Sequence, residues 1–102
     1  MNHGRVSPKQ LWEWLHDGGE ICIADIRDGG PYSRSHLLAA VSIPLAQCEV
    51  LAPALIPRRG TRIVLCDENE QMAEKAAEIL VSNGYENVSI LSGGINSWEF
   101  EG

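Results

Sequence analysis

The sequence predicts an α/β domain with a central, mostly parallel sheet. Short continuous apolar runs, which are typical of strands buried on both faces, recur along the chain. Between them lie segments whose apolar residues repeat at helical spacing. Strands separated by helices need crossover connections, and these make neighbouring strands parallel. A length of 102 residues with 44% hydrophobic content suits one globular domain, residues 1–102.

The first half of the chain is expected to hold one helix and two strands. Ser7 is a helix N-cap residue followed by a proline, and the apolar residues after it predict a helix over 8–17. The apolar run over 20–26 predicts a buried strand. Residues 28–38 are polar and begin with turn residues, so we expect a loop there. A brief strand is predicted over 41–43.

The second half is expected to continue the alternation of helices and strands. A short helix is predicted over 48–55, and the β-branched, apolar run over 62–65 predicts a strand. Alanines and larger apolar residues over 72–80 repeat at helical spacing and stop at a glycine. Residues 88–91 predict another strand, and a final short helix is expected over 95–100.

Acidic residues are concentrated toward the carboxyl end of the chain. Residues 1–66 hold seven Lys or Arg against six Asp or Glu, whereas residues 67–102 hold one against eight, within a formal net charge of −6. Binding to nucleic acid needs basic side chains that displace counterions, so DNA and RNA are excluded as partners. No apolar stretch approaches the ~20 residues of a membrane span, and the polar segment 1–9 is unlike a secretory signal. We therefore expect a cytoplasmic protein with no membrane partner.

One cysteine lies where an enzyme of this architecture would hold a nucleophile. Cys66 follows the predicted strand 62–65 and precedes the next helix, and ligands of open α/β sheets bind at such carboxyl ends. The positive end of that helix would favour the thiolate by about 0.3–1 kcal/mol. The alternative is that Cys66 is only the last buried residue of its strand, because free cysteine is among the most buried residue types.

The other cysteines and the histidines are not expected to carry chemistry. The three cysteines are far apart and fit neither a disulfide framework nor paired zinc ligands. We interpret Cys22, inside an apolar strand, as a core residue and Cys48 as structural or incidental. The histidines show no spacing typical of metal ligands; they are His3, His16 and His36. No metal site and no cofactor are predicted.

Several short motifs occur in the order and spacing of one known family. In the first half they are Asp25-Ile26-Arg27, Tyr32, Ser35-His36-Leu37-Leu38-Ala39-Ala40 and Ser42-Ile43-Pro44. In the second half they are Cys66, Ala76-Ala77, Leu80, Gly84-Tyr85, Leu91-Ser92-Gly93-Gly94-Ile95 and Trp98. The first set resembles the D-V-R, G-H-I-x-G-A and N-I-P signature of rhodanese domains. The second resembles their C-x-x-G-x-R-S and G-Y-x-x-V-x-x-L-x-G-G-x-x-x-W patterns, so the resemblance covers nearly the whole chain.

The resemblance implies both a fold and an activity. The implied fold is rhodanese-like α/β, a central parallel sheet of about five strands flanked by helices on both faces. In active members the cysteine at the Cys66 position accepts a sulfane sulfur as a persulfide and passes it to cyanide, a thiol or a partner protein. The loop that follows cradles this sulfur with backbone N–H groups; its residues here are Asp67, Glu68, Asn69, Glu70, Gln71 and Met72. The family positions that look structural, as an internal charge pair and a loop anchor, are Asp25, Arg27 and His36.

The loop after Cys66 departs from the pattern of many active members. They have glycine where Asn69 stands and arginine where Gln71 stands. Asn tolerates a left-handed backbone, but Gln71 supplies no positive charge. Since the loop holds three carboxylates and no Lys or Arg, we expect dianionic thiosulfate to be a poor donor. Met72 takes the arginine position in the C-x5-R motif of related phosphatases, which argues against a phosphatase.

The sequence leaves two functions open. The first is sulfur transfer through a persulfide on Cys66, from a neutral or protein-bound donor to a thiol, cyanide or protein acceptor. The second is a catalytically silent rhodanese module for protein interaction or regulation, because the loop arginine is missing. A redox-sensing thiol is the least favoured interpretation, since no resolving cysteine lies near Cys66 in the sequence.

The acidic residues after Cys66 also predict a kind of partner. A basic partner or donor protein is expected to bind at this face, more weakly as salt rises. A merely solvated helix face would account equally well for the acidic side chains of Glu70, Glu74 and Glu78.

Overall fold

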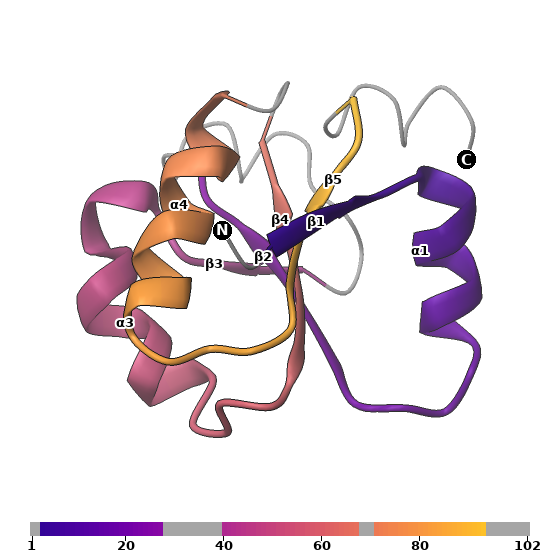
Figure 1. The fold of residues 1–102 in the computed structure, drawn as a ribbon, viewed down its shortest axis with the longest axis horizontal. Coiled ribbons are helices and arrows are strands. Elements are labelled where there is room, and N and C mark those ends of the chain that lie inside the picture. Colours follow the sequence, from indigo (N-terminus) through magenta and orange to yellow (C-terminus); the bar gives the residue numbers. More distant parts are fainter. Residues whose placement is uncertain (1–2, 28–39, 68–70, 94–102) are drawn as a thin grey trace.

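The apolar runs of the chain form one sheet of five strands, all paired in parallel, in the order β1-β5-β4-β2-β3 (Figure 1). The computed structural model describes residues 3–27, 40–67 and 71–93. The strands are β1 His3–Val6, β2 Ile21–Asp25, β3 Ala40–Ser42, β4 Arg62–Cys66 and β5 Val88–Leu91. The helices are α1 Pro8–Leu15, α3 Cys48–Leu55 and α4 Gln71–Ser82, with a 3-10 turn, η1, at Leu45–Gln47.

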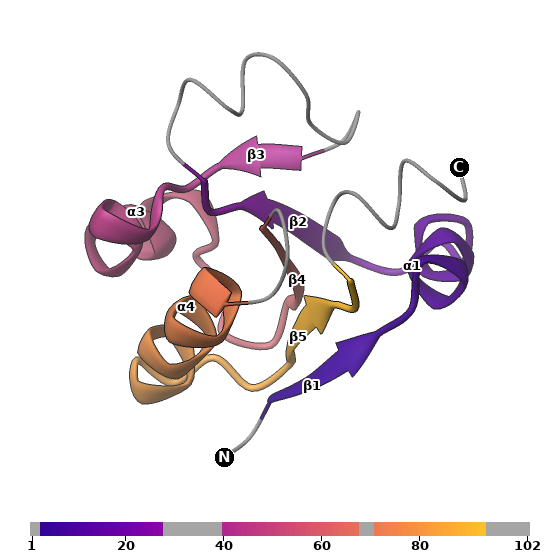
Figure 2. The same cartoon turned by 90° about the horizontal axis from the view of Figure 1, so that it is seen from above.

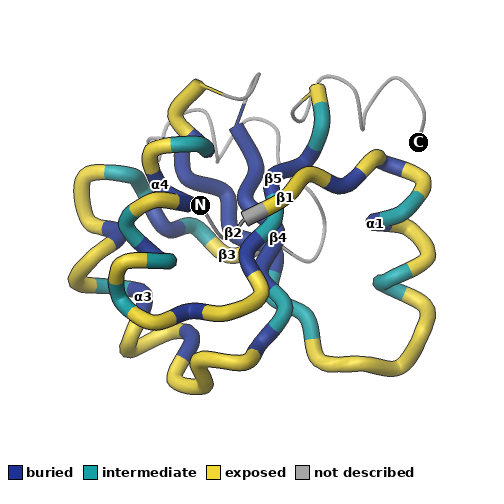
Figure 3. Tube along the Cα trace, in the orientation of Figure 1, coloured by how far each residue is buried: buried dark blue, intermediate teal, exposed yellow. Residues whose placement is uncertain are grey.

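Helices cover both faces of this sheet, as predicted. Figure 2 shows α1 on one side and α3 with α4 on the other. Along β4 the side chains alternate: Ile63 and Leu65 pack with residues of α3 and α4, whereas Val64 and Cys66 pack in the cluster beneath α1. These four residues are fully buried, since β4 has a strand on each side and helices above and below (Figure 3). Burial on both faces explains why this strand is an uninterrupted apolar run.

The predicted elements that fall within the described residues are confirmed, with ends that move by one or two residues. The first helix ends at Leu15 and not at residue 17, because the Asp17 side chain accepts a hydrogen bond from the Gly19 N–H at 2.8 Å and begins a turn. The loop expected over 28–38 and the helix expected over 95–100 lie outside the described residues. None of the helices that the structure describes is both long and apolar enough to cross a membrane.

The strand β1, His3–Val6, was not predicted from the sequence. It is an edge strand that pairs only with β5 among the described residues, so one of its sides lacks a neighbouring strand. Its sequence is polar apart from Val6, which is buried, while Gly4 and Arg5 are exposed. Because Val6 is the only apolar side chain in the segment 3–6, the sequence has no apolar run there, and this is why the pattern did not indicate a strand.

Tyr85, which follows α4, is hydrogen-bonded to the segment that follows α3. Its hydroxyl donates a hydrogen bond to the Ile56 carbonyl at 2.6 Å, and the residue is 2% exposed. We expect Tyr85→Phe to lower the free energy of unfolding by about 1–2 kcal/mol, because the buried Ile56 carbonyl loses its donor. Urea unfolding followed by circular dichroism measures this change, and an unchanged midpoint would contradict it.

Candidate active site

The carboxyl ends of the strands meet at one edge of the sheet, because all the strands run in parallel. Asp25, Cys66 and Leu91 are the last residues of β2, β4 and β5. Cys66 is followed by Asp67, and α4 begins at Gln71. Ligands of open α/β sheets bind at this edge. The structure therefore places the candidate nucleophile at a strand end, directly ahead of a helix, as the sequence predicts.

The thiol of Cys66 is inaccessible to solvent in this conformation. Cys66 is 0% exposed, and it packs with Leu11 of α1 and Val64 in the smaller core cluster. Burial raises the pKa of the Cys66 thiol far above its usual value; the nearby charge of Asp25 raises it further, and that of Arg27 lowers it. Loss of hydration thus outweighs the helix dipole that was expected to favour the thiolate. At neutral pH the thiol is protonated in this state.

A buried ion pair lies beside Cys66. The Arg27 guanidinium donates from Nη2 to Asp25 Oδ2 at 2.7 Å and from Nε to Asp25 Oδ1 at 3.0 Å. The Arg27 backbone N–H also donates to Oδ1, at 3.0 Å. Asp25 is 0% exposed and stands opposite Cys66 in the pairing of β2 with β4. The two opposite charges next to the thiol therefore bind each other.

Asp67 binds the amino end of α4 with its side chain. Its Oδ2 accepts a hydrogen bond from the Met72 N–H at 3.0 Å, and the residue is buried. A carboxylate at a helix amino terminus is stabilised by the unpaired N–H groups and by the helix dipole. The sequence did not indicate this role, because a capping residue is expected directly before its helix and Asp67 lies four residues ahead of Gln71.

The remaining predicted loop residues are only partly described. Gln71 and Met72 open α4 with exposed side chains. Glu68, Asn69 and Glu70 lie outside the described residues, as does the family position His36. Of the site residues predicted, the structure brings together Asp25, Arg27 and Cys66, with Asp67 joining Cys66 to the start of α4.

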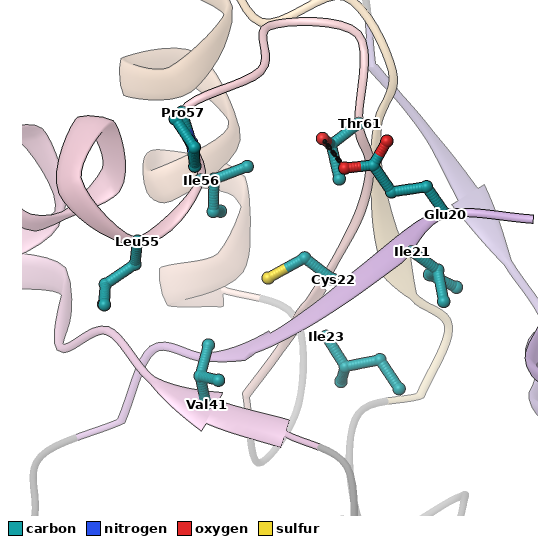
Figure 4. A pocket seen from close by; sticks show the side chains of 9 residues that line it. All are labelled: Glu20, Ile21, Cys22, Ile23, Val41, Leu55, Ile56, Pro57 and Thr61. Atoms are coloured by element: carbon teal, nitrogen blue, oxygen red, sulfur yellow. Dashed lines mark hydrogen bonds between the residues drawn. The ribbon is translucent and has the colours of Figure 1, made fainter.

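A cavity of about 270 Å³ lies at the opposite, amino end of β2 and β4 (Figure 4). Its lining residues are Glu20, Ile21, Cys22, Ile23, Val41, Leu55, Ile56, Pro57 and Thr61. The Cys22 sulfur points into it, and the Thr61 hydroxyl donates to Glu20 at 2.9 Å. Neither Cys66 nor Asp67 lines this cavity, so it is separate from the candidate active site.

The other cysteines are packed away from the candidate active site. Burial raises the pKa of the Cys22 thiol. For Cys48 burial also raises the thiol pKa, and the charge of Glu49 adds to this. Both pack in the larger core cluster, Cys22 as a partly buried residue at its edge. Among the residues that the structure describes, no three His, Cys, Asp or Glu side chains are grouped so that they could hold a metal ion.

Comparisons with known proteins agree with this architecture. Residues 7–101 match the family described as Rhodanese-like domain. A curated relative, the centrosomal protein of 41 kDa from Gallus gallus, is 32% identical over 83 residues, which are 72% of this chain and 22% of that protein. The chain thus spans less than a quarter of that relative's length.

Solved structures with the same fold include sulfur-transfer enzymes. A thiosulfate sulfurtransferase from Pseudomonas aeruginosa superimposes with a TM-score of 0.91 at 31% identity, over 96% of this chain and 19% of that one. The Alr3790 protein from Anabaena sp. superimposes with a TM-score of 0.89 at 26% identity, over 95% of this chain and 87% of that one. With the motifs, the all-parallel sheet and the cysteine at the end of β4, these matches show that the chain belongs to the rhodanese-like domain family.

Proposed function

We propose that this domain is a sulfurtransferase that carries sulfane sulfur as a persulfide on Cys66. The observation that carries the proposal is the position of Cys66 at the end of β4, ahead of α4, in a rhodanese-like domain. The likeness to a thiosulfate sulfurtransferase supports the reaction class. The three free cysteines suit a reducing compartment such as the cytoplasm.

The proposed reaction has two displacement steps at sulfur. The Cys66 thiolate attacks the outer sulfur of a persulfide donor, a new S–S bond forms on Cys66, and the donor S–S bond breaks. Its electron pair leaves on the inner sulfur of the donor, which takes up the proton that Cys66 gave up and departs as a thiol. An acceptor thiolate or cyanide then attacks the outer sulfur and releases the Cys66 thiolate, with thiocyanate as the product from cyanide.

The charges near Cys66 favour some donors over others. Residues 67–74 carry four carboxylates and no Lys or Arg, so a dianion approaching the sulfur is repelled. We propose a neutral or protein-bound donor in place of free thiosulfate, and a thiol, cyanide or protein as the acceptor. A basic partner protein would bind this face, with an affinity that falls as salt rises.

Intact-protein mass spectrometry tests the proposal. We expect the wild type to gain one sulfur atom from a thiol-persulfide donor and little from thiosulfate, and to lose that atom when cyanide is added. Cys66→Ser is expected to gain none, whereas Cys22→Ser, which alters a cysteine at the opposite edge of the sheet, keeps the gain. Loading that persists in Cys66→Ser would disprove the role of Cys66.

A catalytically silent interaction module is the second candidate function. Two observations favour it: the Cys66 thiol is fully buried, and Gln71 stands where many active members have arginine. The relative named as a centrosomal protein fits this alternative, since that name describes a place and no reaction. If no donor loads the wild type although Cys66 can be alkylated, the interaction module is the better assignment.

A further inference from the structure

The cavity at the amino end of β2 and β4 takes no part in the proposed sulfur transfer. We propose that it is a binding site for a small organic amine. The apolar body of the ligand fills the cavity, and its ammonium group contacts the Glu20 carboxylate on the polar wall. Binding there is independent of the chemistry at Cys66.

The cavity is large enough for one ring with a short polar arm. Its volume is about 270 Å³, whereas a cavity of about 150 Å³ already admits benzene. Its walls come from separate parts of the chain: the start of β2, Val41 of β3, residues 55–57 at the end of α3, and Thr61 ahead of β4 (Figure 4). Concave sites with mostly apolar walls and a few polar groups are typical of small-molecule binding.

One wall of the cavity is apolar and faces water. Val41 and Leu55, which line it, are 38% and 49% exposed. Ile56, which is buried, lines the cavity beside Leu55. In Figure 4 Leu55 lies across the cavity from Glu20 and Thr61. A ring placed against this wall removes apolar surface from water, which favours binding.

The polar wall offers a carboxylate that can accept further hydrogen bonds. The hydroxyl of Thr61, a buried residue, donates to Glu20 Oε2 at 2.9 Å. Arg58 Nη1 lies 3.3 Å from Glu20 Oε1, in a pair whose side chains are both exposed, so this contact is weak. An ionised carboxylate accepts about four hydrogen bonds, and the contacts among the described residues occupy two of these positions. A ligand ammonium, with three donors, can therefore join or replace Arg58 at Glu20.

The charge of the wall favours an amine over an anion. Of the described residues that line the cavity, Glu20 carries the single charge at neutral pH. Cys22, the other ionisable group on the wall, stays a neutral thiol there because burial raises its pKa. Glu20 repels a carboxylate or phosphate ligand, whereas an ammonium donates to it and leaves the apolar body of the ligand facing Leu55.

Cys22 can report whether the cavity is filled. Its sulfur points into the cavity (Figure 4), and the residue is partly exposed, whereas Cys48 and Cys66 are buried. A ligand that fills the cavity therefore shields Cys22 from a thiol reagent. A short cysteine peptide added to the same sample has no cavity, and its rate of alkylation corrects for any reagent that the amine consumes.

Two probes of the same shape separate the charge of the ligand from its apolar body. Benzylamine is a cation at neutral pH, and benzyl alcohol is neutral. In NMR titrations of the ¹⁵N-labelled chain we expect a Kd of about 1 mM for benzylamine and about fivefold weaker binding of benzyl alcohol. The amides of residues 20–23 and 61 should shift most. Benzylamine at about 10 mM should slow the alkylation of Cys22 by iodoacetamide about tenfold.

A variant of Glu20 and a matched control test the charge on the wall. Glu20→Gln removes the charge and keeps an oxygen that can accept from the Thr61 hydroxyl. We expect it to weaken benzylamine binding about fivefold and benzyl alcohol binding by less than about twofold. Glu13→Gln makes the same change at an exposed position of α1, which covers the other face of the sheet, and should change neither affinity by more than about twofold. Circular dichroism confirms that each variant is folded.

Two results would overturn the proposed site, and neither depends on sulfur loading. One is benzylamine at about 10 mM that shifts none of these amides or leaves the alkylation of Cys22 unchanged. The other is equal affinity of the wild type for both probes with no loss in Glu20→Gln, which would show that the carboxylate does not select an amine.

Discussion

Replacing Arg27 by methionine is expected to lower the free energy of unfolding by about 3–5 kcal/mol, the largest loss of stability that we predict for a single substitution here. Methionine keeps the length of the side chain and its apolar contacts but removes the charge. The Asp25 carboxylate, which is 0% exposed, would then lose the three hydrogen bonds that it accepts from the Nε and Nη2 groups of Arg27, and methionine supplies no polar group in their place. A buried charge without its partner costs far more than the pair itself contributes.

A double variant and an exposed pair provide the controls for this prediction. Asp25→Ala with Arg27→Met removes both charges, and its loss of stability should be smaller than that of Arg27→Met alone. Arg58→Met breaks a pair with Glu20 whose side chains are 78% and 52% exposed, and it should change the free energy of unfolding by less than about 1 kcal/mol. Equal losses for Arg27→Met and Arg58→Met in urea unfolding would contradict the prediction.

Much of the fold follows from local patterns in the sequence. The segment from Arg62 to Ser82 is the clearest case, because an apolar run and a helical repeat separated by a short polar loop specify strand, loop and helix. Local patterns do not predict the edge strand β1. It pairs with β5, His3 opposite Val88 and Val6 opposite Leu91, and these residues are far apart in the chain. Only the tertiary structure supplies the neighbour that makes this polar segment a strand.

The candidate site was predictable in position but not in its electrostatics. Cys66 was placed at a strand end by pattern, and Asp25 with Arg27 by family resemblance. The extent of burial at Cys66 depends on Leu11 and other residues of distant elements, which no local pattern reveals. The sequence therefore left two interpretations of Cys66 open, a nucleophile favoured by the helix dipole and a buried strand end. An interaction with the helix dipole of about 1 kcal/mol is small beside the cost of burying a thiolate.

Because the Cys66 thiol is buried, the proposed sulfur transfer depends on how easily the domain opens to expose it. The thiolate, and not the thiol, is the nucleophile in sulfur transfer. Because the described conformation favours the protonated form of Cys66 and shields it from solvent, reaction requires a state in which the thiol is more exposed. The rate at which Cys66 reacts with a small probe measures how often that state occurs.

Native Cys66 is accordingly expected to react with iodoacetamide at least about 100-fold more slowly at about pH 8 than the same cysteine in the unfolded chain. Burial raises the pKa of this thiol, so the thiolate fraction in the folded domain should still grow about tenfold per pH unit up to about pH 10. In urea the rate should level off above about pH 9, where an ordinary thiol is ionised. Mass spectrometry of the Cys66 peptide after timed quenching gives both rates.

The difference between the pKa of the Cys66 thiol in the folded and in the unfolded chain also determines how the stability of the domain changes with pH. Because the folded pKa of Cys66 lies above the unfolded one, its contribution to stability is complete below about pH 8.5 and is lost as pH rises beyond it, by up to about 1.4 kcal/mol per unit. Cys66→Ala should lack this part of the loss of stability at alkaline pH.

Alkylation of native Cys66 at a rate within about tenfold of the rate in the unfolded chain would contradict the predicted slow alkylation and show that solvent reaches the thiol readily. If loading from a persulfide rises with pH in parallel with alkylation, formation of the Cys66 thiolate limits both reactions.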